Sequence, residues 1–212
     1  MSLDIRPYAP GDDAALMGVC LQTGAAGEDA TGMLEEPDLL SHIWLLPYLA
    51  LAPDLASVVA DGDAPAVGYV LGALDSRAFE AACERDVWPA LRARYELGAF
   101  PAPSFDAQLV RLIHHPPVAE AELVAGFPSH LHIDLLPEAQ GGGFGRRLID
   151  RLVEQLTAAG STGIHLHTSV RNTKSAAFYR RLGFDEWGTA GGGTVTFVRR
   201  LRSAPHRARF PG

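Results

Sequence analysis

The chain has 212 residues, of which 18 are basic and 25 acidic, giving a formal net charge of −7 at pH 7. This length suits one domain with a sizeable core. The acidic balance argues against nucleic acid as a partner, because that binding depends on neutralising phosphates. Two cysteines are too few for a disulfide framework or a metal cluster.

The sequence carries no secretory or membrane signal. Its first residues contain neither a basic start nor an apolar run. No stretch is long and apolar enough to cross a membrane. We therefore expect a soluble cytoplasmic protein that does not bind a membrane. All aspartates and glutamates precede residue 187, so the negative charge is concentrated before the C-terminal segment. This charge either favours a cationic acceptor such as an amine or serves solubility only.

The N-terminal third alternates short strands and helices. Residues 61–63 read Asp-Gly-Asp between two apolar runs, which is typical of a hairpin turn. The expected elements are, in chain order, a strand at 3–7, a helix at 11–20, a loop at 22–36, a helix at 37–50 and hairpin strands at 57–60 and 66–74.

Residues 76–128 are predicted to be helical. A long helix at 76–95, with Ser76 as its N-cap, is followed by a Pro/Gly loop and two short helices at 105–113 and 118–125. The block has no strands of its own and is too short to stand alone, so we interpret it as an insertion on the same core. His114 and His115 have no third ligand at metal spacing, and no metal site is expected.

Residues 130–184 read strand, glycine turn, helix, strand, loop, helix. Residues 130–136 alternate polar and apolar, the period of a half-buried strand, and Pro137 ends it. The rest of this segment is predicted as a glycine loop at 140–147, a one-face apolar helix ended by Gly160, a strand at 163–170, and a short helix that holds Phe178 and Tyr179 and is capped by Gly183.

The glycine loop has the chemistry of an anion site. Glycines allow positive φ and close approach of a ligand, and consecutive N–H groups at a helix start attract a phosphate. A tight turn with no ligand remains the alternative. The loop is neither a dinucleotide fingerprint nor a P-loop, since it fits no G-x-G-x-x-G frame and no Lys-Ser/Thr pair follows it.

Two motifs in this order resemble the coenzyme-A-binding core of the GCN5-related N-acetyltransferase (GNAT) superfamily. They are Gln-x-x-Gly-x-Gly at residues 140–145, and Asn172 followed by Phe178-Tyr179-x-x-Leu-Gly-Phe. The segments 5–8, 68–72, 88–95 and 126–129 extend the resemblance to the acetyltransferase-like domain found at the C-terminus of animal O-GlcNAcases and as free-standing bacterial proteins.

The resemblance implies an α/β (α+β) GNAT fold: a mixed sheet splayed between two parallel strands and flanked by helices, with a helical insertion. One domain would cover 1–203, with the acetyl-CoA core at 130–184 and a flexible tail at 204–212. After the core, Trp187 and residues 191–193 are expected to form a turn before a final strand at 194–198.

The resemblance also implies the residues that hold acetyl-CoA. The N–H groups from Gln140 to Gly145 would bind the pyrophosphate, and Leu135 or Leu136 would polarise the thioester carbonyl. Asn172 would contact the pantetheine arm. The full set implied for the coenzyme is Leu135, Leu136, Gln140, Gly141, Gly142, Gly143, Phe144, Gly145, Arg146, Asn172, Lys174, Ser175 and Phe178.

Two residues are the catalytic candidates. Tyr179, at the superfamily's tyrosine position, would protonate the leaving thiolate, because a phenol with a normal pKa near 10 keeps its proton at neutral pH. Asp134 would act as base, with a pKa raised by its apolar strand. His132, His165 and His167 are further base candidates if the two strands place them on one side.

Two functions from different classes fit the sequence. The first is an N-acetyltransferase that transfers acetyl directly to an amine, small molecule or protein lysine, in a ternary complex. The second is an acetyl-CoA-binding module that transfers nothing. The loop 171–174 carries no second acid, so a one-base or water-relayed scheme is expected. The sequence leaves the acceptor and the choice of monomer or homodimer open.

Overall fold

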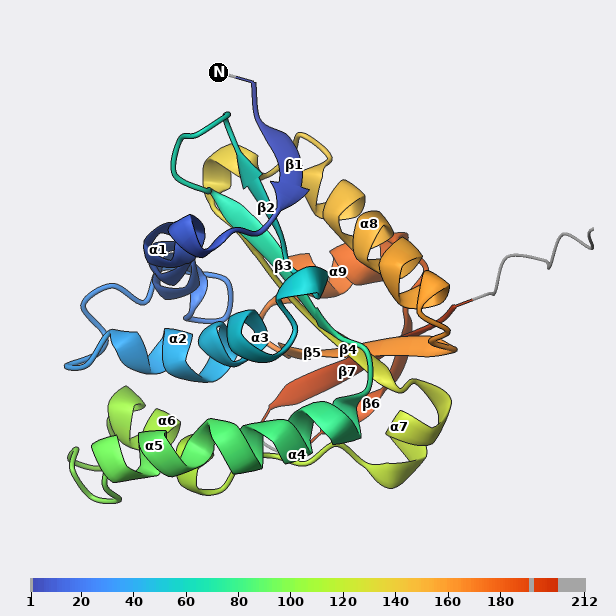
Figure 1. The fold of residues 1–212 in the computed structure, drawn as a ribbon. Coiled ribbons are helices and arrows are strands. Elements are labelled where there is room, and N and C mark those ends of the chain that lie inside the picture. Colours follow the sequence, from blue (N-terminus) through green and yellow to red (C-terminus); the bar gives the residue numbers. More distant parts are fainter. Residues whose placement is uncertain (1, 191–192, 202–212) are drawn as a thin grey trace, which may run out of the picture.

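The computed structural model describes residues 2–190 and 193–201 (Figure 1). Its centre is a mixed sheet in the order β1-β2-β3-β4-β5-β7-β6, in which β4 and β5 are parallel and the other neighbours antiparallel. The strands are β1 (Asp4–Pro7), β2 (Ser57–Ala60), β3 (Gly68–Ala73), β4 (Ser129–Leu135), β5 (Gly163–Ser169), β6 (Asp185–Ala190) and β7 (Thr194–Arg200).

Helices cover both faces of this sheet, and the predicted mixed α/β architecture is confirmed. In chain order they are α1 (Asp13–Thr23), α2 (Asp38–Trp44), α3 (Leu46–Leu51), α4 (Ser76–Asp86), α5 (Trp88–Arg94), α6 (Phe105–His114), α7 (Ala121–Gly126), α8 (Phe144–Ala158) and α9 (Thr173–Arg181). None of the helices in the described ranges is long and apolar enough to span a bilayer.

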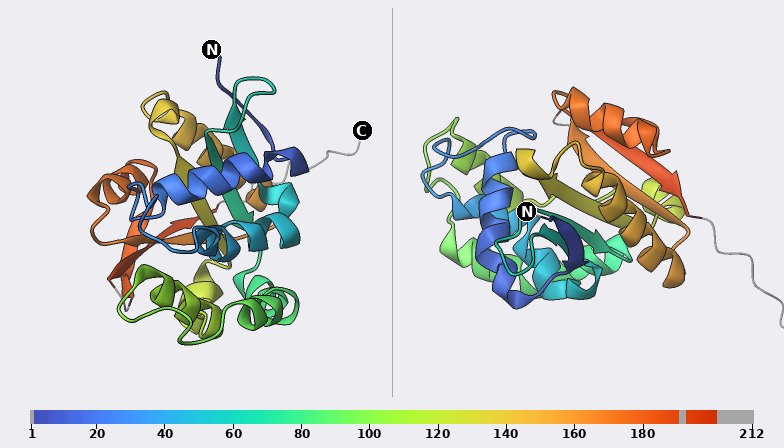
Figure 2. Two further views of the ribbon diagram at one scale, coloured as in Figure 1. Left: turned by 90° about the vertical axis from the view of Figure 1, so that its left-hand side faces the viewer. Right: turned by 90° about the horizontal axis from the view of Figure 1, so that it is seen from above.

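Side chains alternate between two apolar cores, one on each face of the sheet. Tyr69 and Leu71 of β3 pack with α1, α2, α3 and α6, whereas Val70 packs with α8 and α9. Figure 2 shows α1 and α8 on opposite sides of the strands. A ligand that crosses from one layer to the other must therefore pass through the sheet.

The sheet opens between its two parallel strands. β4 pairs with β5 only at Ser129↔Ile164 and His130↔His165. Beyond these residues β4 continues to Leu135 along β3, while β5 continues to Ser169 along β7. Among the described residues, no strand pairs with this edge of β4 after His130, and this splay is the passage between the two layers.

Two predicted helices are broken by prolines. The helix expected at 37–50 divides at Leu45, just before Pro47, and the one expected at 76–95 divides at Val87, just before Pro89. A proline inside a helix removes an N–H donor and clashes with the preceding turn, so each begins a new helix at its first turn.

Two smaller predictions were also wrong. The N-cap of α4 is Asp75, whose carboxylate accepts from the N–H of Ala78, while the Ser76 hydroxyl donates to Pro128 O. Trp187 lies in the edge strand β6 rather than in a turn, at a register shift between Glu186 and Gly188, both of which pair with β7. Residues 191–192 and the predicted tail at 204–212 lie outside the described residues.

Candidate active site

The glycine loop joins the end of β4 to the start of α8. Gly141 and Gly143 have φ of 78° and 81°, a region that other residues rarely adopt. Gln140 anchors the loop, because its N–H donates to Pro137 O and its side-chain amide donates to Leu135 O at 2.8 Å. The N–H of Gln140 is therefore engaged, and its predicted role as a pyrophosphate donor is wrong.

Six consecutive N–H groups, from Gly141 to Arg146, have no acceptor within the described part of the chain. They lie at the N-terminus of a 15-residue helix, whose dipole adds partial positive charge. Arg146 is exposed beside them, and its guanidinium donates to Arg181 O at 3.4 Å. This row of donors fits a pyrophosphate.

Gly145 allows α8 to approach α9. A Cβ at this position would lie 3.0 Å from the ring of Phe178 and 3.3 Å from the side chain of Leu135. Phe178 thus packs from α9 against the start of α8, and a larger residue at position 145 would push the start of α8 away from α9. The predicted loop residues and Phe178 form one local structure.

The open edge of β4 presents main-chain groups to the splay. Leu136 N–H donates to Val67 O at 2.9 Å, so Leu136 is not a free donor and its predicted role at the thioester is wrong. Because antiparallel pairing alternates the direction of successive N–H groups, those of Ile133 and Leu135 point away from β3. Of the two predicted donors, Leu135 is therefore the one whose N–H faces the splay.

The start of α9 is held by the other predicted coenzyme residues. Asn172 Oδ1 accepts from Ser175 N–H at 3.0 Å and so caps the helix, while Ser175 Oγ contacts Thr168. Lys174 lies 3.8 Å from Glu28, and both side chains are largely exposed. The contact of Asn172 with a pantetheine arm stays a prediction.

Tyr179 is buried in an aromatic group on α9. Its ring packs with Phe178, Phe184 and Phe197 at centroid distances of 5.4–5.8 Å. Burial, and then the negative charge of Asp134, raise the pKa of its hydroxyl, so the expected normal phenol pKa is wrong. The hydroxyl keeps its proton at neutral pH and is a strong candidate for a hydrogen-bond donor.

Asp134 projects from the opposite face of β4, and its environment also differs from the expectation. Its carboxylate accepts from the Tyr69 hydroxyl at 2.6 Å and lies 3.0 Å from His132 Nε2. Burial raises its pKa, but the charge of His132 and hydrogen bonding with His132, Tyr69 and Thr23 outweigh burial, so the pKa is lowered. Asp134 stays ionised, and a raised pKa is wrong.

The histidines of β4 and β5 lie on one side of the sheet, which is the condition that the sequence left open. The rings of His130 and His165 are 5.6 Å apart, and His167 lies 5.6 Å from His165. His165 is 2% exposed and donates from Nδ1 to Phe127 O, while His167 contacts the Thr196 hydroxyl. Burial lowers the pKa of both rings, to about 4 for His165, which indicates structural roles.

His165 should make the folded state sensitive to acid. Its pKa falls from 6.5 to about 4 on folding, mainly through burial, so only the unfolded chain takes up a proton between these values. Its contribution is present above pH 6.5 and is lost as the pH falls toward 4. We expect the stability advantage of the wild type over His165→Asn in urea unfolding to shrink by about 2–3 kcal/mol from pH 7 to pH 4.5. The exposed His115→Asn variant is the control, and equal slopes for all three proteins would contradict the assignment.

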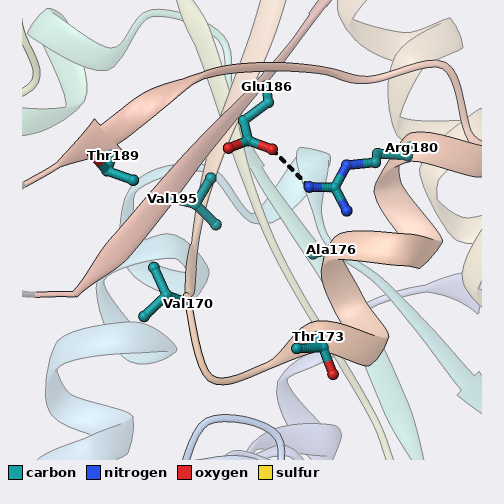
Figure 3. A pocket seen from close by; sticks show the side chains of 7 residues that line it. All are labelled: Val170, Thr173, Ala176, Arg180, Glu186, Thr189 and Val195. Atoms are coloured by element: carbon teal, nitrogen blue, oxygen red, sulfur yellow. Dashed lines mark hydrogen bonds and ion pairs between the residues drawn. The ribbon is translucent and has the colours of Figure 1, made fainter.

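A separate pocket of about 210 Å³ lies between α9 and the strands β6 and β7. Figure 3 shows the Arg180–Glu186 ion pair, 2.6 Å long, at its rim. Thr173, Ala176 and Arg180 line it from the face of α9 that points away from Phe178. It is thus distinct from the splay and the glycine loop.

Sequence reasoning missed three side chains around Asp134. Tyr69 comes from β3, Thr23 from α1, and Trp44 from α2 stacks on His132 with centroids 6.3 Å apart. In the sequence, Tyr69 was noted only as part of the segment 68–72, which contributed to the family resemblance. The register that sets Tyr69 opposite Asp134 joins strands on either side of the long helical segment between β3 and β4, and it could not be read from the sequence.

Comparisons with known proteins agree with this geometry. The profile of the Acetyltransferase (GNAT) family matches residues 33–184. Protein O-GlcNAcase of Rattus norvegicus is 26% identical over 183 residues, which are 84% of this chain and 20% of that protein. The chain therefore spans about a fifth of the length of this curated relative.

Solved structures show the same fold. The crystal structure of SsHAT has a TM-score of 0.88 and 37% identity, and the match covers 95% of this chain and 100% of that one. A phosphinothricin acetyltransferase from Sinorhizobium meliloti, solved in complex with AcCoA, has a TM-score of 0.58 and 16% identity, with 97% and 91% covered. The splayed parallel strands, the glycine loop and the family match lead to one conclusion: the chain belongs to the Acetyltransferase (GNAT) family.

Proposed function

We propose that this protein transfers the acetyl group of acetyl-CoA directly to an amine, in a ternary complex of enzyme, donor and acceptor. The observation that carries the proposal is the splay. Within the described residues, the edge of β4 after His130 has no strand partner and the six N–H groups from Gly141 to Arg146 have no acceptor, and both border the passage between the two layers.

The donor tail is held on the α8 side of the sheet. The N–H groups of Gly141 to Arg146 donate to the pyrophosphate, and the exposed Arg146 adds a full positive charge. From there the pantetheine arm follows the open edge of β4, where main-chain groups alternate toward it. The fold thereby aims the thioester at the middle of the splay.

Two groups of this chain stabilise the charge that develops during transfer. Leu135 N–H donates to the thioester carbonyl oxygen, as in an oxyanion hole. The Tyr179 hydroxyl donates a hydrogen bond to the departing sulfur. The pKa of this hydroxyl lies above that of an ordinary thiol, which is near 8.5. The hydroxyl therefore stabilises the thiolate by donating a hydrogen bond and keeps its own proton.

The acceptor approaches from the layer of α1 and α2, since the donor occupies the other side. An amine is the natural nucleophile for an acetyltransferase site in which a carboxylate and an imidazole face the splay. Both a small amine and a protein lysine fit this description. The acetyltransferase-like domain of O-GlcNAcase, to which the chain is similar, does not fix the choice.

The test is acceptor-dependent release of CoA thiol from acetyl-CoA. Separate pools of small amines, amino acids, aminosugars and lysine peptides are supplied, and calorimetry measures donor binding. We expect one pool to give turnover. When the donor concentration is varied at several fixed acceptor concentrations, the double-reciprocal plots of rate should give lines that intersect. Parallel lines would indicate a covalent acetyl-enzyme instead of direct attack. Tight donor binding with no turnover in any pool would favour the non-catalytic module.

A further inference from the structure

The side chains on the acceptor side of β4 form a hydrogen-bonded group that we call the Asp134 cluster: Asp134, His132 and Tyr69. The Asp134 side chain is 18% exposed, and its carboxylate accepts a hydrogen bond from the Tyr69 hydroxyl at 2.6 Å. His132 is the more open member, with 30% of its side chain exposed. A carboxylate that is saturated in this way is a poor base, but it can orient one.

The hydrogen-bond pattern fixes the tautomer of His132. An ionised carboxylate only accepts, so the hydrogen between the two groups resides on His132 Nε2, 3.0 Å from Asp134 Oδ2. In the neutral ring the lone pair is then on Nδ1. Within the described residues Nδ1 of His132 has no hydrogen-bond partner. The ring therefore keeps one basic nitrogen available.

Aromatic contacts hold the ring in place. Trp44 stacks on His132 with an interplanar angle of 21°, and the ring of Tyr69 lies 6.0 Å from it on the β3 side. His132 itself is two residues beyond His130, the last residue of β4 that pairs with β5. It is thus fixed beside the splay, on the face opposite the glycine loop.

We propose that His132 is the general base of acetyl transfer and that Asp134 is its positioning residue; this rests on the function proposed above. Nδ1 of His132 takes a proton from the amine as the N–C bond to the acetyl carbon forms and the C–S bond breaks. The sulfur leaves with the electron pair and receives a proton from solvent. His132 then releases its proton to solvent, and the Asp134 carboxylate stabilises the imidazolium in between.

The other groups that face His132 keep one charge state around neutral pH. The pKa of Asp134 is lowered, as described above, whereas burial raises the pKa of Tyr69 and raises that of Cys20, on α1, to about 12. Burial and the neighbouring histidines lower the pKa of His130 to about 3. Thr23 and Trp44 do not titrate. These groups therefore add no change of charge of their own near neutral pH.

The experiment compares His132→Gln and His132→Ala with the wild type. Gln keeps an amide N–H for Asp134 but cannot accept a proton. We expect kcat/KM for the acceptor to fall about 100-fold or more in both, with unchanged acetyl-CoA affinity by calorimetry. The acidic limb of the pH profile should disappear, and added imidazole should restore part of the rate of His132→Ala. Asp134→Asn should lower kcat/KM less than either His132 variant does and should alter the shape of the pH profile.

The matched control is His42→Asn. His42 lies on the same helix as Trp44, and among the described side chains its one hydrogen-bond partner is the Tyr95 hydroxyl. Its kinetics should equal those of the wild type. The proposal is overturned if His132→Gln binds the donor and turns over normally, or if its rate falls while the acidic limb persists and imidazole gives no rescue. If the wild type itself never turns over, the proposed function fails and this proposal fails with it.

Discussion

Replacing Tyr179 with phenylalanine is expected to lower kcat about 100-fold while the affinity for acetyl-CoA stays unchanged. The substitution removes one hydroxyl and leaves the ring packed with Phe178, Phe184 and Phe197. Loss of a positioned donor to a departing group typically costs at least this factor. Steady-state release of CoA thiol at saturating donor and acceptor, with calorimetry for the donor, measures both quantities.

The control is Tyr8→Phe, which removes a hydroxyl that donates to Asp13, near the N-terminus of α1. It should leave kcat unchanged. A Tyr179→Phe protein with normal kcat would assign Tyr179 to packing alone. If kcat and donor affinity fall together, the residue supports the donor site rather than the departing sulfur.

Most of the architecture around the site was predictable, because it depends on local patterns. Alternation in 130–136 indicated the strand and correctly set His132 and Asp134 on one face. The glycine loop was recognisable because Gly141 and Gly143 do need positive φ, and Gly145 needs close helix packing. Local sequence determines such features within a few residues, so a pattern can reveal them.

The chemistry of Asp134 was not predictable, because it depends on partners far along the chain. An aspartate in an apolar strand suggests a raised pKa, but Tyr69, 65 residues away, supplies a hydroxyl that favours the ionised form. The same applies to Leu136, whose N–H is taken by Val67 across the β3–β4 pairing. The helical segment between β3 and β4 hides that register from sequence reasoning.

The second large effect concerns the anion site. Gly142→Asp is expected to weaken acetyl-CoA binding at least 100-fold relative to Gly142→Asn, a difference of about 2.7 kcal/mol. Unlike its neighbours Gly141 and Gly143, Gly142 does not have positive φ, and a Cβ there would meet only the ring of Phe144, at 3.1 Å. The two variants therefore share shape and backbone cost and differ by one charge.

That charge lies among the N–H groups that bind the pyrophosphate, where like charges a few ångströms apart repel by several kcal/mol at an effective dielectric constant near 20. Calorimetry at low and high salt measures the difference, which should narrow as salt screens the repulsion. Acetyl-pantetheine, which lacks the pyrophosphate, is the control donor, and the two variants should use it equally well. Equal acetyl-CoA affinity of the Asp and Asn variants would place the pyrophosphate away from the glycine loop, because no donor bound on Gly141 to Arg146 could escape a carboxylate at position 142.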